Sequence, residues 1–167
     1  TIEDGIEIIA SGVFASSLFT NIKLPNSVKI IENQAFMNSC LLKNIELSEN
    51  ITEIGAQAFY NCKSLTSITI PEGVTKIGNG AFTKSGLTSL HIPASVESLG
   101  YQVAEESAIV SLTFAENSSL TFIDHRAFMN CDSLVGPVIL PDGLIDIDYG
   151  AFNSCDKLKA VKMPDSV

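Results

Sequence analysis

Hydrophobic and polar residues alternate in a pattern that recurs about every 23 positions along the chain. In one clear copy, Leu65, Ile68 and Ile70 are separated by small polar residues, and the next copy begins immediately afterwards at Leu87. Aligning the copies gives the half units 1–18 and 158–167 and the whole units 19–41, 42–64, 65–86, 87–108, 109–133 and 134–157. The whole chain is therefore built from one repeating unit.

The first part of each unit predicts a short, half-buried β-strand. Its apolar residues alternate with polar ones, as in 65–70, and many of them are β-branched. A proline such as Pro71 usually ends this segment, because proline has no N–H to donate to a sheet. A second short segment follows, with apolar residues three positions apart that face inward, such as Val74 and Ile77.

An Ala-Phe pair then recurs, as in Ala58-Phe59 and Ala81-Phe82. Six of the nine phenylalanines occupy this position, which predicts a stacked aromatic ladder in the core. Unit 87–108 lacks the ladder phenylalanine and reads Val103-Ala104. Either this is a degenerate repeat in which Tyr101 fills the space, or the following Glu105-Glu106 marks a local bulge or contact point.

A unit this short cannot bury its apolar face alone, so neighbouring units must stack into a continuous core. The repeats therefore predict a solenoid. The first segments of successive units should form one continuous parallel sheet on one face. At roughly 4.8 Å between strands, six to seven coils make a body about 30 Å long.

The residues that carry this pattern resemble a known family. The opening Leu-x-x-Ile-x-Ile matches leucine-rich repeats, although Gly73 and Ser95 stand where that pattern places Asn or Cys. The remainder, Val-x-x-Ile-Gly-x-x-Ala-Phe-x-x-Cys-x-x-Leu, resembles the BspA-like subclass and is nearly complete in 74–87 and 144–158. The resemblance implies an α/β-type repeat solenoid: a right-handed superhelix with a parallel sheet on the concave face and 3-10 or helical turns on the convex face.

Composition excludes several classes of protein. Hydrophobic residues make up 46% of the chain, which is too many for a disordered acidic tail. The net charge is −9 and the lysines are scattered, so we expect no nucleic-acid partner. The longest apolar runs are only a few residues, and Thr1-Ile2-Glu3-Asp4 lacks the layout of a signal peptide. We expect no membrane insertion by this segment.

The four cysteines Cys40, Cys62, Cys131 and Cys155 all follow the ladder position by three or four residues. Serine takes their place in the units between, as at Ser85, so the slot suits a small buried residue at a tight corner. We expect free thiols, although adjacent coils could bring two cysteines near disulfide distance. No Cys-x-x-Cys pair occurs, so no metal site is expected.

No catalytic or cofactor-binding residues are indicated. His91 and His125 lie in different slots, and the chain contains no nucleophile motif or glycine-rich phosphate loop. Two irregularities stand out: unit 109–133 has two extra residues around 117–119, and Gly136-Pro137 interrupts the next strand segment. Such insertions form loops, which often carry function but are also widely tolerated.

The outward residues of the first segments predict a binding strip on the concave face. Their side chains are short and uncharged in the middle of the strip, with charge toward its ends, so they can hydrogen-bond a protein or a glycan at little entropic cost. The strip comprises Asn21, Lys23, Asn44, Glu46, Ser67, Thr69, Ser89, His91, Ser111, Thr113 and Lys162.

The family resemblance implies surface or secreted proteins of bacteria and parasitic protists that adhere to host proteins or to other cells. We therefore expect a non-catalytic binding module at a cell surface or secreted, with a host matrix protein, cell-surface protein or glycan as partner. A passive spacer that projects another domain is the alternative, and an enzyme ranks third. Because the chain begins and ends in mid-repeat, we expect it to be a fragment of a longer array.

Overall fold

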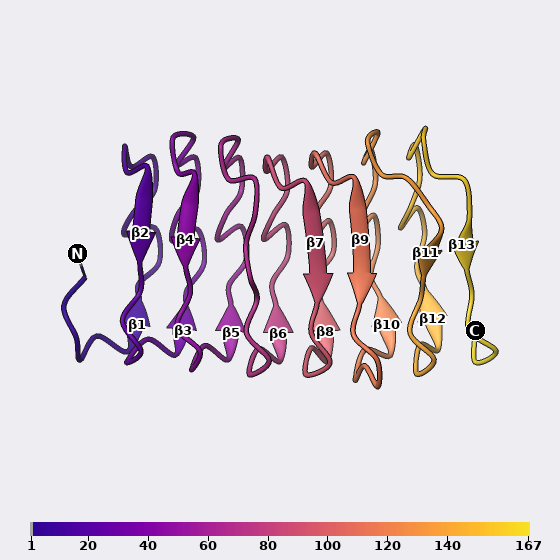
Figure 1. Ribbon diagram of the computed structural model, residues 1–167, viewed down its shortest axis with the longest axis horizontal. Coiled ribbons are helices and arrows are strands. Elements are labelled where there is room, and N and C mark those ends of the chain that lie inside the picture. The colour runs from indigo at the N-terminus through magenta and orange to yellow at the C-terminus, as the bar shows by residue number, and fades with distance from the viewer. Residues whose placement is uncertain (1) are drawn as a thin grey trace.

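The computed structural model describes residues 2–167, which form thirteen short strands wound into a solenoid (Figure 1). Seven strands form one parallel sheet: β1 Ile8–Ile9, β3 Ile30–Ile31, β5 Glu53–Ile54, β6 Lys76–Ile77, β8 Ser98–Leu99, β10 Phe122–Ile123 and β12 Asp146–Ile147. The other six form parallel pairs: β2 Asn21–Lys23 with β4 Asn44–Glu46, β7 Ser89–Ile92 with β9 Ser111–Phe114, and β11 Val138–Ile139 with β13 Val161–Lys162. Each coil of the solenoid therefore presents two sides. One side carries the seven-stranded sheet. The other side carries the three strand pairs, and we call it the first-strand face because its strands come from the first segment of each repeat unit.

The seven-stranded sheet is built from the second segment of each unit. Each of its strands is only two residues long, and the second residue points inward: Ile31, Ile54 and Ile77 are buried. Partners in this sheet are separated by one coil, as for Ile8 opposite Ile30 and Phe122 opposite Asp146. Backbone hydrogen bonds of this sheet therefore connect successive coils from β1 to β12.

The prediction of one continuous sheet from the first segments is wrong. Residues 65–70 form no strand, although the Thr88 N–H still donates to the Thr66 carbonyl at 3.0 Å. A second break separates β9 from β11. There, the run from Leu134 to Leu140 is one residue longer than in the other units, and Pro137 has no N–H for the ladder. The first-strand face therefore consists of three separate strand pairs.

A proline opens the turn that joins the two sides. The Pro25 carbonyl accepts from the Val28 N–H at 3.0 Å, and the Pro93 carbonyl accepts from the Val96 N–H at 3.3 Å. The valine is fully buried in both turns. Proline thus ends the first segment, as predicted, while its carbonyl closes a four-residue turn that leads the chain into the seven-stranded sheet.

The expected 3-10 or helical turns are wrong, because residues 2–167 contain no helix of either kind. The Ala-Phe segments instead form successive four-residue turns, such as Ala35 N–H to the Glu32 carbonyl at 3.3 Å. The residue before the Ala-Phe alanine and the second residue after the phenylalanine have positive φ, for example Gln34 and Asn38, both at 60°. A helix requires negative φ throughout, so these two residues prevent helical continuation.

The aromatic ladder is confirmed. The ring centroids of Phe14 and Phe36 are 5.4 Å apart, those of Phe59 and Phe82 are 5.7 Å apart, and Phe128 stacks on the next ring at 5.3 Å. Ala104 takes the phenylalanine position in the irregular unit and is fully buried. Tyr101 is 45% exposed, so it does not fill the gap.

Candidate binding surface

Every residue of the predicted strip is exposed in the structure. The alternation along the strands accounts for this, because Ile45, Leu90 and Leu112 point inward while their neighbours point outward. The strip is discontinuous, however, since the strand pairing of the first-strand face is broken on both sides of the central pair. Its residues therefore fall into separate groups.

The first group lies on β2 and β4, whose outward residues face each other in register. The Asn44 Nδ2–H donates to Asn21 Oδ1 at 2.7 Å, so the two amides form a short ladder. Beside them, Lys23 Nζ lies 2.7 Å from Glu46 Oε2. The hydrogen bond to the Glu46 carboxylate raises the pKa of Lys23.

This group lines a hollow of about 450 Å³ that extends onto the neighbouring coil. Its floor is formed by Ile22, Ile45 and Ile68. The hollow is lined by six of the eleven predicted residues: Asn21, Lys23, Asn44, Glu46, Ser67 and Thr69. The structure thus brings the N-terminal half of the strip together around one concave site that offers amides, hydroxyls and an ion pair.

The second group lies on β7 and β9 and is uncharged. His91 Nδ1 and Thr113 Oγ1 are 2.9 Å apart, and Ser89 lies opposite Ser111. The remaining residue, Lys162 on β13, lies opposite Ile139, an apolar side chain that is 59% exposed. Lys162 therefore does not join the other predicted residues in one site.

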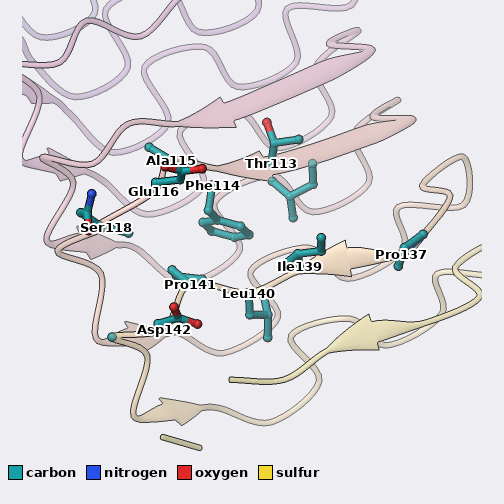
Figure 2. Close-up of a pocket in the computed structure, with 13 residues that line it drawn as sticks. Thr113, Phe114, Ala115, Glu116, Ser118, Pro137, Ile139, Leu140, Pro141 and Asp142 are labelled. Atoms are coloured by element: carbon teal, nitrogen blue, oxygen red, sulfur yellow. The ribbon is translucent and has the colours of Figure 1, made fainter. Parts of the chain in front are cut away.

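A cleft of about 620 Å³ opens beside the second group (Figure 2). Phe114 and Glu116 line one wall, and Ile139, Pro141 and Asp142 line the other. Both irregularities seen in the sequence border this cleft: Asn117 and Ser118 from the insertion, and Pro137 from the interrupted strand segment. Each irregularity is visible in the sequence by itself. Only the stacking of neighbouring coils brings the two irregularities to one site.

The cysteine slot is a structural corner. The Cys62 thiol donates to the Phe36 carbonyl at 3.1 Å, and Ser39 Oγ makes the equivalent bond to the Phe14 carbonyl at 2.8 Å. Burial raises the pKa of the Cys62 thiol to about 12. Cys40 does not belong to this slot, contrary to the prediction. It lies one residue beyond Ser39, and its thiol donates instead to the Asn61 carbonyl at 3.3 Å.

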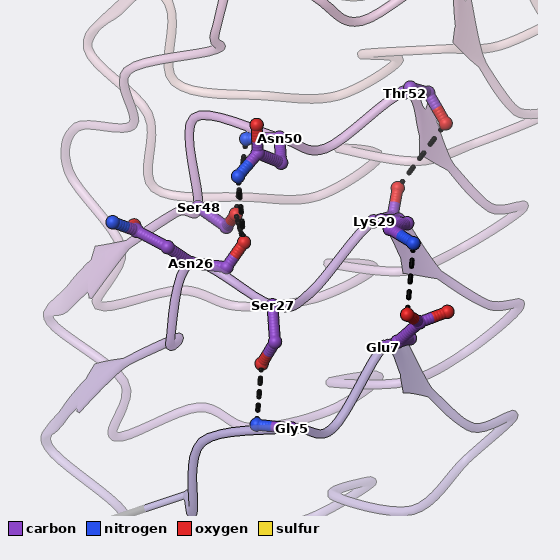
Figure 3. A network of polar contacts seen from close by, with 8 residues as sticks. All are labelled: Gly5, Glu7, Asn26, Ser27, Lys29, Ser48, Asn50 and Thr52. Atoms are coloured by element: carbon purple, nitrogen blue, oxygen red, sulfur yellow. Dashed lines mark hydrogen bonds and ion pairs between the residues drawn. The ribbon is translucent and has the colours of Figure 1, made fainter.

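The polar side chains at the turns mostly join one coil to the next (Figure 3). Ser27 Oγ accepts from the Gly5 N–H at 3.0 Å, and the Asn50 side-chain amide donates to the Asn26 carbonyl at 2.8 Å. Lys29 Nζ lies 2.9 Å from a carboxylate oxygen of the preceding coil. These groups hold neighbouring coils together.

The histidines and the acidic side chains of residues 2–167 are dispersed over the structure. No three His, Cys, Asp or Glu side chains gather there in a way that could hold a metal ion. His91 contacts Thr113, whereas His125 stacks on Tyr149 with ring centroids 5.6 Å apart, so the two histidines are not paired. The same residues include no helix with the length and apolar character needed to cross a bilayer.

A known protein family has the same repeat as this chain. The model described as BspA type leucine-rich repeat region matches residues 7–135 and 104–167, in six copies. The chain belongs to this family. The BspA-type pattern therefore explains the positions of the buried aliphatic residues and of the Ala-Phe ladder. A comparison with curated proteins gave no significant match.

Solved structures show the same architecture as this BspA-type chain. A leucine-rich repeat protein from Bacteroides ovatus superposes with a TM-score of 0.85 and is 26% identical; the match covers 97% of this chain and 42% of that protein. The leucine-rich repeat protein of T. pallidum gives a TM-score of 0.83 at 27% identity, covering 94% and 74% of the two chains. A leucine-rich repeat protein from Eubacterium ventriosum shares the fold, with a TM-score of 0.69 and 21% identity. That match covers 98% of this chain and 54% of the other protein. The chain thus spans less than half of the B. ovatus protein.

Proposed function

We propose that this chain is a non-catalytic binding module that acts in adhesion at a cell surface or as a secreted protein. The observation that carries the proposal is the hollow over β2, β4 and the Ser67–Thr69 segment, which is lined by six outward residues of the strip. Membership of the BspA-type leucine-rich repeat family supports it, because repeat scaffolds of this kind use extended faces for recognition.

The chemistry of the hollow suits a polar partner. The Asn21–Asn44 amide pair and the Lys23–Glu46 ion pair supply both donors and acceptors. These side chains are already linked across the strands, so a ligand would find them held in place and would lose less entropy on binding. A host matrix or cell-surface protein, or a glycan, offers the matching groups.

A binding assay with two matched variants tests this proposal. The chain should bind an immobilised matrix protein or an arrayed glycan, and the double variant Asn44→Lys, Thr69→Lys should bind it at least tenfold more weakly. The control is Thr75→Lys, Ser98→Lys, which puts two lysines at exposed positions on the side of the seven-stranded sheet. It should bind like the parent chain.

Two results would contradict the proposal. Equal binding by the hollow variant and the control would show that recognition does not use the hollow. If the parent chain bound no matrix protein, cell or glycan, it would act as a spacer instead. The proposed location predicts that antibodies against the chain label intact, unpermeabilised cells of the source organism or detect the protein in culture medium.

A further inference from the structure

The Ala-Phe turns carry a concave site of their own at the irregular unit 87–108. A pocket of about 470 Å³ spans three neighbouring coils there, and this volume lies within the range of roughly 300–1,000 Å³ that is usual for ligand sites. Both residues of the Glu105-Glu106 pair line it, together with Tyr60 and Tyr101. It shares no residue with the hollow over β2 and β4. We call it the turn pocket.

The turn pocket is centred on a glycine of its middle coil. Gly80 lies between Gln57 and Gln102, which occupy the same position in the two flanking coils, and φ is 61° at the glycine and 55° at both glutamines. The Gln57 N–H donates to the Asn79 carbonyl at 2.8 Å, and the Gly80 N–H donates to the Tyr101 carbonyl at 2.9 Å, so the three coils are aligned. The flanking coils are two strand spacings, roughly 10 Å, apart, which leaves space above the glycine.

The coil of unit 87–108 supplies a buried carboxylate that can accept more hydrogen bonds. Glu105 is only 8% exposed, and its Oε2 accepts from the side-chain amide of Gln102. Among residues 2–167, the Glu105 carboxylate accepts no other hydrogen bond. A carboxylate can accept about four hydrogen bonds, and a buried one is costly when its bonds are unmade. Donor groups of a ligand would therefore be stabilised at Glu105.

The opposite coil supplies a hydrogen-bond donor. Gln57 Oε1 accepts from the Gln34 side-chain amide at 2.9 Å, so the oxygen is bonded to the preceding coil and the Gln57 Nε2 group is the part of the amide left for a ligand. Tyr101 lines the same pocket and is 45% exposed, which makes its ring an accessible flat surface. The pocket thus combines an acceptor, a donor and an aromatic face.

The charges in the turn pocket favour a neutral ligand. Lys84 Nζ lies 3.7 Å from Glu106 Oε2 and 5.9 Å from the centroid of the Tyr60 ring. Lys84 therefore already occupies the place that a cation would take beside this ring, and it would repel a second one. Glu105 and Glu106 outnumber the single lysine of the pocket, so an anion would be repelled as well.

We propose that the turn pocket binds a neutral saccharide through one pyranose ring. Such a ring has C–H groups on its faces and hydroxyls around its edge, and each hydroxyl can donate and accept. The ring face packs on Tyr101, while hydroxyls donate to Glu105 and accept from Gln57. This site goes beyond the proposed adhesion function, because it lies on the Ala-Phe turns and uses none of the strip residues.

NMR titration of the 15N-labelled chain with single sugars tests the chemistry of the ligand. The probes are glucose, galactose and mannose, and at least one of them should bind saturably. The matched controls are the uronic acid and the amino sugar of each probe, which add a negative or a positive charge to a similar ring. Both controls should bind at least tenfold more weakly than the neutral sugar that binds best.

Two pairs of variants test the location. Gly80→Gln fills the pocket with the side chain that the flanking coils already carry at the same positive φ, and it should raise the dissociation constant at least tenfold. Gly12→Gln makes the same change at φ +63° in another coil, where the space is open, and should have no effect. Tyr101→Ala should also weaken binding at least tenfold, whereas Tyr149→Ala, at the equivalent exposed position, should not.

The proposal is wrong if none of the three sugars binds saturably, if a charged control binds as well as its neutral sugar, or if Tyr101→Ala and Tyr149→Ala behave alike. Thermal unfolding checks that Gly80→Gln is folded, and the tyrosine pair decides if it is not. The hollow variant Asn44→Lys, Thr69→Lys should retain sugar binding, and its loss would place the sugar in the hollow. If the parent chain shows no adhesion but binds the sugar, the proposed function fails and the turn pocket stands.

Discussion

The rings of Phe36 and Phe59 lie parallel to within 2°, with their centroids 5.3 Å apart. The two residues occupy the same position in consecutive coils, and both are fully buried. The Phe36 carbonyl also anchors the neighbouring turn, since it accepts from the Cys62 thiol. One repeated side chain therefore joins the core of each coil to that of the next.

Removing a ring from the middle of this ladder should be costly. Phe59→Ala is expected to lower the free energy of unfolding by about 3–5 kcal/mol, because the cavity cannot close between two stacked neighbours. The half-buried Phe152 provides the matched control, and Phe152→Ala should cost clearly less. Urea denaturation followed by circular dichroism measures both. Equal losses would show that ladder stacking does not determine the stability.

The buried Cys62 thiol predicts a pH dependence of stability. Its pKa in the folded chain is about 12, against an ordinary value of 9.0. The unfolded chain therefore releases this proton first, so the stabilisation is complete below pH 9 and is lost as the pH rises toward 12. The loss should be about 1.4 kcal/mol per pH unit in that window.

Cys62→Ser is the control for this pH effect, because serine does not titrate in the window and is the native residue at the equivalent Ser39. The unfolding free energy of the variant should fall less steeply with pH than that of the parent chain. Parallel curves for the two proteins would contradict the assignment.

The two C-terminal cysteines should differ in reactivity. A hydrogen bond with Cys131 lowers the pKa of the half-buried Cys155 thiol, while the same bond together with burial raises the pKa of Cys131. Alkylation by iodoacetamide near neutral pH should therefore modify Cys155 before Cys131 and Cys62, as mapped by mass spectrometry. Cys131→Ala should slow the labelling of Cys155. An unchanged rate would show that the neighbouring thiol has no such influence.

Gly86 is required by close approach of two coils. A Cβ added at this position would collide with the backbone carbonyl oxygen of Lys63, which cannot rotate away. Gly86→Ala should therefore destabilise the chain by roughly 3 kcal/mol. At Gly12, by contrast, φ is +63° and the space is open, so Gly12→Ala should cost only about 1 kcal/mol. Thermal unfolding of both variants tests whether Gly86→Ala is the more destabilising change. A smaller loss of stability in Gly86→Ala than in Gly12→Ala would contradict this prediction.

The ladder and the short strands could be predicted because one repeated slot has one chemical requirement. The phenylalanine position is the clearest case, since a large apolar side chain recurs at a fixed spacing. The sequence also contains a signal that no helix forms at the Ala-Phe turns. Gly12, Gly80 and Gly150 occupy the position that Gln34 has in another unit, and recurring glycine there indicates positive φ.

The broken sheet and the cleft could not be predicted in the same way. The segment 65–70 keeps the full alternation of its neighbours, and nothing in the structure explains why it forms no strand. At the second break, the extra residue and Pro137 were visible, but their effect depends on pairing with β9 in another coil. Contacts between coils also decide which predicted strip residues share a site, as Ser67 and Thr69 do with β2 and β4.

The unequal pairing on the two sides has a mechanical consequence. The seven-stranded sheet links all coils without interruption, whereas the first-strand face is divided into three pairs. Bending that opens the first-strand face at its two breaks separates few backbone bonds. Bending in the opposite sense must stretch the sheet. The solenoid is therefore stiff in one direction and compliant in the other, with the compliant joint between β9 and β11 located at the cleft.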